Sequence, residues 1–87
     1  MESGKIVRSI SGHDKNRFYM IVEAKDGFVW IADGKRRKLL KPKRKNARHV
    51  APTSTILCID EVTSDKRLRY LLRPFNGPAG DTEREGV

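Results

Sequence analysis

Apolar positions in the first half of the chain occur in short runs separated by turn-forming residues. The runs at residues 5–10, 17–24 and 28–33 are rich in β-branched and aromatic side chains, which is typical of β-strands. Such close spacing, without helical segments between the runs, favours a small antiparallel barrel over a helix-covered parallel sheet. In the third run, alternation predicts that Val29 and Ile31 face the core.

The residues between these runs predict how the strands are joined. Asp26-Gly27 separates the second and third runs, and Asp-Gly between apolar runs is a strong signal for a tight hairpin. A second Asp-Gly pair at 33–34 predicts another hairpin that leads into a short basic strand at residues 36–40. Pro42 should end that strand, because proline cannot donate to a sheet ladder. The apolar positions between residues 50 and 59 predict a closing strand.

The hydrophobic period changes near residue 63. Thr63 or Ser64 can cap a helix, and Asp65 in the first turn suits the helix dipole. Pro74 should end this helix. The apolar positions fall at helical spacing and form one stripe, made of Leu68, Leu71, Leu72 and Phe75.

The predicted organisation is therefore one small, mainly β domain with a C-terminal addition. An SH3-like antiparallel barrel is expected at residues 1–62, with a short helix at 63–75 packed on or beside it. Residues 76–87 combine glycine, proline and charge, which predicts a disordered tail. A chain of 87 residues has room for one domain.

The charge of the chain is strongly positive and unevenly placed. The formal net charge is +8, and no Asp or Glu occurs from Gly34 to Ile59. Such an excess predicts an anionic partner: nucleic acid, a membrane surface or an acidic protein. Concentration of the charge in one segment favours nucleic acid, and the chain lacks the long apolar face of a membrane-surface helix.

Compartment and chemistry are constrained by what the sequence lacks. Cys58 is the single cysteine, so no intrachain disulfide can form and a reducing, cytoplasmic compartment is expected. The first residues do not resemble a signal peptide. Neither paired-cysteine metal spacing nor a Walker-type loop occurs, and Cys58 sits in an apolar run that predicts a core position. We therefore expect a protein that is not an enzyme and needs neither metal nor cofactor.

Two segments are candidates for phosphate binding. The stronger is the segment 35–49, which contains nine Lys and Arg residues among fifteen, because like charges at this density repel and a polyanion relieves the repulsion. The other is the loop 12–17, where backbone N–H groups and cations can hold a phosphate, although an ordinary hairpin loop would look similar. The candidate contacts are Gly12, His13, Lys15, Asn16, Arg17, Lys35, Arg36, Arg37, Lys38, Lys41, Lys43, Arg44, Lys45, Arg48 and His49.

Two further features of these segments lead to specific expectations. Leu39 and Leu40 should anchor the basic segment to the barrel, and the segment should form one phosphate-facing rim with the loop 12–17. Tyr19 and Trp30 are candidates for stacking on unpaired bases. Phe18 and Phe28 are expected in the core instead.

The stretches "SGHDK", "IADGK" and "KPKRK" with His49 resemble the KOW motif and its continuation in bacterial KOW-domain RNA-binding proteins. Those proteins are similar to the KOW-containing large-subunit ribosomal proteins of archaea and eukaryotes. The resemblance covers roughly residues 3–52 and implies an SH3-like barrel that binds RNA, in particular ribosomal RNA. Asn16 stands where the group usually has a second loop glycine, and His13 stands where arginine is common, which weakens one phosphate contact.

The sequence thus predicts a non-catalytic module that binds ribosomal RNA or associates with the large ribosomal subunit. Ribosomal proteins are further expected partners, and a monomer is favoured. Two alternatives stay open. One is an adaptor that docks on an acidic partner of the translation or transcription machinery, and the other is DNA binding of the kind known for elongation-factor KOW domains.

Overall fold

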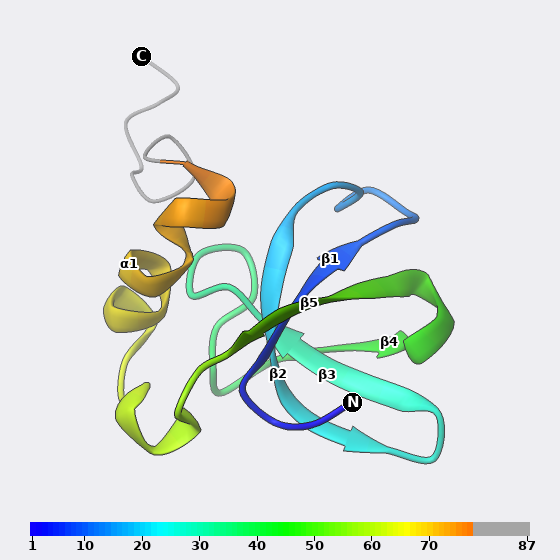
Figure 1. Cartoon of the computed structure of the whole chain (residues 1–87), viewed down its shortest axis with the longest axis horizontal. Helices are drawn as coiled ribbons and strands as arrows, with labels where there is room; N and C mark the ends of the chain where they lie inside the picture. The colour runs from blue at the N-terminus through cyan, green and yellow to red at the C-terminus, as the bar shows by residue number, and fades with distance from the viewer. Residues whose placement is uncertain (78–87) are drawn as a thin grey trace.

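The computed structural model describes residues 1–77. It consists of one antiparallel sheet and one C-terminal helix, α1, which lies beside the sheet (Figure 1). The five strands are ordered β4-β3-β2-β1-β5 in the sheet. The strands are β1 (Lys5–Ser9), β2 (Phe18–Lys25), β3 (Phe28–Ala32), β4 (Lys43–Asn46) and β5 (Val50–Ile56); the helix is α1 (Asp65–Asn76), and two 3₁₀ turns are η1 (Ala47–His49) and η2 (Ile59–Glu61).

The first hairpin prediction is confirmed in detail. Lys25 pairs with Phe28 across a two-residue turn, and both turn residues have positive φ, 55° at Asp26 and 83° at Gly27. A turn of this hand matches the twist of the flanking strands. The mainly β, antiparallel character predicted from the pattern of apolar runs is therefore the observed one.

The prediction of a fourth strand at residues 36–40 is wrong. The Asp33 carboxylate accepts hydrogen bonds from the backbone N–H groups of Lys35 and Arg37, each at 2.9 Å, and this curls the chain into a loop directly after β3. The fourth strand comes later, as β4, which pairs with β3 from Lys43 opposite Ile31 to Asn46 opposite Phe28. Pro42 therefore precedes the strand.

The apolar side chains form two clusters, one on each face of the sheet. On one face the sheet curls around Val7, Tyr19, Ile21, Val29, Ile31 and Val50, which confirms the inward assignment of Val29 and Ile31. Val50 belongs to edge strand β5, so the curl brings β5 against the β3 side chains. Within residues 1–77 the edge strands β4 and β5 follow one another through η1 and are not paired with each other.

The second cluster joins the helix to the other face of the sheet. Leu68 and Leu72 of α1 are buried against Ile6, Met20 and Ala32 of the sheet. The remaining stripe positions, Leu71 and Phe75, pack at the edge of this cluster, so the predicted stripe is confirmed. The helix is part of the core.

The cap at the start of α1 is one of the two that were predicted, whereas the helix ends later than expected. Ser64 is the N-cap, and its hydroxyl accepts a hydrogen bond from the backbone N–H of Arg67 at 3.1 Å. Pro74 lies inside the helix, which continues to Asn76. The last turn is held because the Asn76 amide bonds both backbone groups of Phe18, at 2.9 and 3.0 Å. Of the predicted tail, 76–87, Asn76 thus belongs to the helix and Gly77 is its C-cap. Residues 78–87 lie outside the described residues.

Two apolar positions are misassigned by the sequence pattern. Leu39 packs against the helix-facing cluster as expected, but Leu40 is 94% exposed and anchors nothing. Cys58 is also exposed, because it follows β5 in a segment without a regular partner. In the part of the chain that the structure describes, no helix has the length and apolar character needed to cross a membrane.

Candidate nucleic-acid interface

Backbone hydrogen bonds fix the shape of the loop between β1 and β2. The N–H of Asn16 bonds the carbonyl of Ser9 at 2.7 Å, and the N–H of Ser9 bonds the carbonyl of Arg17 at 2.9 Å. Asn16 takes φ 74°, a conformation that asparagine tolerates better than most residues. Its side-chain oxygen also accepts from Arg8 at 2.9 Å. The asparagine therefore serves in the place where a glycine was expected.

A buried carboxylate, that of Asp14, ties this loop to strand β4. It accepts hydrogen bonds from the Ser9 hydroxyl at 2.8 Å and from the Lys45 ammonium at 3.0 Å. Lys43 approaches the same carboxylate at 3.4 Å. Lys45 also donates to the carbonyl of Ser11 at 2.9 Å. The loop and β4, far apart in the sequence, are thus held side by side.

The charges around Asp14 determine its protonation. Burial alone would raise the pKa of Asp14, but hydrogen bonds from Ser9 and Lys45 and the positive charges of Lys45 and Lys43 outweigh it and lower the pKa to about 2. The neighbouring Tyr19 shows the opposite effect. Its burial, with the negative charges of Asp14 and Asp33, raises the pKa of Tyr19 to about 12. Asp14 is therefore ionised and Tyr19 neutral at neutral pH.

Asp33 makes a second link between the two candidate segments. Its side chain is 0% exposed and pairs with Arg17 at 3.0 Å. The other carboxylate oxygen holds the backbone of Lys35 and Arg37, as described above. One carboxylate thus joins the end of the β1–β2 loop to the start of the loop 33–42.

The two loops meet at a small polar cleft of about 170 Å³. Its lining comes from the β1–β2 loop and the start of β2, from the loop 33–42 and from the first residue of β4. The lining residues are His13, Asp14, Tyr19, Arg36, Arg37 and Lys43. The structure therefore brings together the two segments that the sequence predicted to lie side by side.

The exposed Lys, Arg and His side chains of these two loops form what we call the basic rim: His13, Lys15, Arg36, Arg37, Lys38 and Lys41. Gly12 and Asn16 are exposed on the same β1–β2 loop. Arg17, Lys35 and Lys43 are partly buried beneath the rim. Arg48 and His49 are exposed on η1, where the His49 carbonyl accepts from the N–H of Ile10 at the beginning of the β1–β2 loop.

Lys45, Tyr19 and Arg44 are predicted contacts whose side chains are turned away from this rim or buried. Lys45 is only 8% exposed, because its ammonium is used to neutralise Asp14. Tyr19 is 1% exposed, so it offers no ring face to a base. Arg44 points to the other side of β4, since alternate side chains face opposite ways, and its guanidinium lies 4.9 Å from the centre of the Phe28 ring.

Trp30 lies on that other side as well. It pairs directly with Arg44 across β3 and β4 and is partly exposed. Trp30, predicted as a stacking residue, therefore lies on a face that β4 turns away from the rim.

Sequence reasoning missed the two acidic residues that organise the rim. The sequence pattern gave no role to Asp14 and indicated only a turn at Asp33. The available signal was their position: each is the acid nearest to one of the basic segments. In the folded chain both carboxylates turn inward, and the cations are left on the surface.

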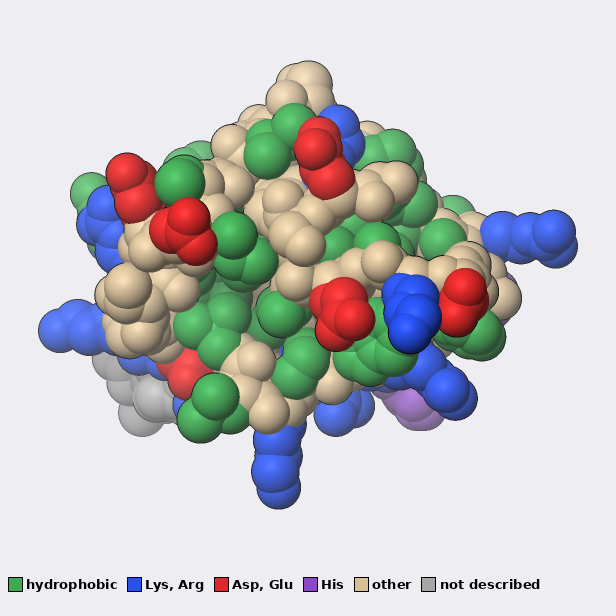
Figure 2. All heavy atoms as spheres, turned by 90° about the horizontal axis from the view of Figure 1, so that it is seen from below, with side chains coloured by type: hydrophobic (Ala, Val, Ile, Leu, Met, Phe, Trp, Pro, Cys, Tyr) green, Lys and Arg blue, Asp and Glu red, His purple; other side chains and the backbone are tan. Residues whose placement is uncertain are grey.

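The charge distribution elsewhere differs from that of the rim. On the face shown in Figure 2, Asp and Glu side chains lie among apolar ones, a basic side chain lies between two of the acids, and other Lys and Arg project from the margin. Exposed acids occur at the N-terminus, at the β2–β3 turn and in η2, at Glu2, Glu23, Asp26, Asp60 and Glu61. Within residues 1–77 the exposed acids therefore belong to segments other than the two loops of the basic rim.

No family model matches this chain, and neither does any curated protein. Function is therefore inferred from the basic rim and from the way buried acids organise it. A surface of exposed cations over internally neutralised carboxylates is suited to binding several phosphates of one polyanion.

Proposed function

We propose that this protein is a non-catalytic RNA-binding module that contacts the phosphate backbone through its basic rim. The observation that carries the proposal is the burial of Asp14 and Asp33. The two acids within the basic loops accept internal hydrogen bonds. The rim therefore presents cations without carboxylates that would compete with a phosphate for them. Both loops are also fixed in shape, which lowers the entropy cost of binding.

Ribosomal RNA, within or near the large ribosomal subunit, is the target that we propose. This finer assignment is supported by the resemblance of residues 3–52 to KOW-domain proteins. Cross-linking in cells followed by sequencing of the bound RNA tests it. Enrichment of large-subunit RNA is expected, and an even spread over messenger RNAs would remove the ribosomal part of the proposal.

Binding of a hairpin RNA at several salt concentrations tests the role of the rim. Each phosphate contact contributes about 0.7–0.9 to the slope of log K against log salt. In the double variant Arg36→Glu/Arg37→Glu, the slope should fall by about 1.4–1.8. Affinity at low salt should fall about 10- to 100-fold. Both side chains are exposed, so the fold should be unchanged.

A charge-matched control separates local contacts from net charge. Lys5 begins β1 and Lys25 ends β2, so both lie at the far ends of the strands that the β1–β2 loop joins. Lys5→Glu/Lys25→Glu makes the same change in net charge and should affect binding much less. Equal losses in the two double variants would mean that the rim is not the contact surface. A protein that stays with its cellular partners after nuclease treatment would favour the adaptor alternative.

A further inference from the structure

The outer side of α1 carries an exposed aromatic ring among cations. Tyr70 is 56% exposed, although tyrosine usually buries most of its ring in a domain of this size. Lys66 and Arg67 precede it by about one turn, so they share the helix side opposite to the buried Leu68 and Leu72. The Arg67 guanidinium lies 5.7 Å from the centre of the Tyr70 ring, within the range of a cation–π contact.

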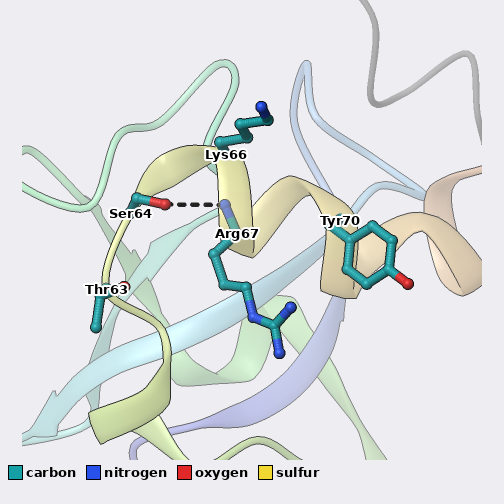
Figure 3. A pocket seen from close by; sticks show the side chains of 5 residues that line it. All are labelled: Thr63, Ser64, Lys66, Arg67 and Tyr70. Carbon is teal, nitrogen blue, oxygen red and sulfur yellow. Dashed lines mark hydrogen bonds between the residues drawn. The ribbon is translucent and has the colours of Figure 1, made fainter.

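Hollows flank this ring on two sides. One, of about 400 Å³, is lined by Thr63, Ser64, Lys66, Arg67 and Tyr70. In Figure 3, Arg67 and Tyr70 border this hollow, the Tyr70 hydroxyl points away from the ribbon, and Lys66 projects in another direction. The second hollow, of about 430 Å³, is lined by Tyr70, Leu71, Arg73 and Pro74. Tyr70 is the residue common to both.

The surroundings of this ring are positive and adjoin the loop that carries part of the basic rim. The one acid of α1, Asp65, is engaged by the backbone N–H of Leu39 at 2.8 Å. Arg69 of α1 donates to the carbonyl of Gly34 at 2.7 Å. The loop 33–42, with Arg36 and Arg37, is therefore attached to the helix. The loop of the rim and the Tyr70 ring are therefore joined through one helix.

We propose that Tyr70 is a stacking site for an unpaired RNA base, with Lys66 and Arg67 contacting the adjoining phosphates. This inference rests on the proposed RNA-binding function and specifies a part of the ligand: a single-stranded nucleotide next to the segment held by the rim. An exposed ring with space beside it suits an unstacked base, whereas a base within a duplex has no free face to offer.

The experiment compares two probes, a single-stranded oligo-adenylate that contains 2-aminopurine and a blunt RNA duplex. Tyr70→Ala should weaken binding of the single strand about 5- to 100-fold and reduce the quenching of 2-aminopurine that stacking causes. Duplex affinity and the salt slope should stay as in the wild type, because no phosphate contact is removed. Tyr70→Phe should retain most of the affinity, since the ring is kept.

Ile56→Ala is the matched control, because Ile56 is 50% exposed at the end of β5, and it should bind both probes normally. If Tyr70→Ala binds and quenches the single strand like the wild type while Arg36→Glu/Arg37→Glu loses the duplex, the stacking site is wrong and the rim proposal stands. If the wild type binds neither probe, RNA binding itself is wrong, and the stacking site with it.

Discussion

At the scale of single residues, two buried aspartates divide the cations into those that pair inside the protein and those that stay exposed for a ligand. Asp14 draws Lys45 into the protein, and Asp33 does the same to Arg17. A cation that compensates a buried carboxylate is not available to a phosphate, and removing it leaves an uncompensated charge. The two basic segments, 12–17 and 35–49, therefore contain both internal partners of carboxylates and rim residues. Their spacing in the sequence does not distinguish the two kinds.

The low pKa of Asp14 predicts a specific loss of stability in acid. The folded-state pKa of about 2 is below the ordinary value of 3.8, so the unfolded chain binds the proton first as pH falls. The ionised Asp14 therefore contributes about 2 kcal/mol to the free energy of unfolding. This contribution is present in full above about pH 4 and is lost as pH falls through about 2. Asp14→Asn should thus be less stable than the wild type at neutral pH. This gap in free energy of unfolding between the two proteins should become smaller in acid.

Urea unfolding at a series of pH values measures this gap. Asp26→Asn corrects for the loss of one negative charge, because Asp26 is exposed in the β2–β3 turn and asparagine accepts the same positive φ. A gap between the wild type and Asp14→Asn that stayed constant from neutral to acid pH would show that Asp14 is not held ionised by its neighbours.

At the scale of elements, the attachment of the loop 33–42 to α1 depends on a glycine. Gly34 has φ 81°, and a Cβ there would overlap the backbone carbonyl of Asp65 and approach Arg69. Gly34→Ala should destabilise the protein through both positive φ and this overlap. Gly27 has φ 83° with open space around it, so Gly27→Ala incurs only the conformational cost, about 1–3 kcal/mol.

The difference between these two variants measures the fit of the loop against the helix. In urea unfolding, Gly34→Ala should lose about 1–3 kcal/mol more than Gly27→Ala, the usual cost of overpacking. Equal losses would indicate that the loop moves away from α1 at no cost, and that the helix does not hold the rim in place.

The elements that the sequence predicts correctly are those whose signals are local. Alternation identifies β1, β2 and β3, and the Asp26-Gly27 turn needs only its own φ values. The prediction of a strand at 36–40 is wrong because Asp33 caps the backbone of the following residues, and hydrogen bonding to side chains competes with sheet formation. Pro74 does not end α1 because Asn76 reaches Phe18, a contact between residues far apart in the chain.

At the scale of the whole molecule, the candidate site was also predictable from the sequence only in part. Adjacency of the two basic segments was predictable in outline, since both border one small barrel-like sheet. The set of exposed cations was not predictable, because it depends on which side chains of β4 and of the two loops pair with Asp14 and Asp33. Tyr70 was not singled out, although the predicted stripe of Leu68 and Leu72 already leaves it off the apolar side of the helix.

Because Leu68 and Leu72 share one cluster with Ile6, Met20 and Ala32, the helix and sheet should unfold together. The single Trp, Trp30, reports on β3 by fluorescence, while far-ultraviolet circular dichroism reports on α1. Both signals should give one urea midpoint in the wild type. Leu68→Ala should reduce the free energy of unfolding by about 2–5 kcal/mol. It should therefore lower the urea midpoints of both signals equally. Loss of the helical signal before that of Trp30 would instead make α1 a separate unit, able to leave the sheet and carry Tyr70 away from the rim.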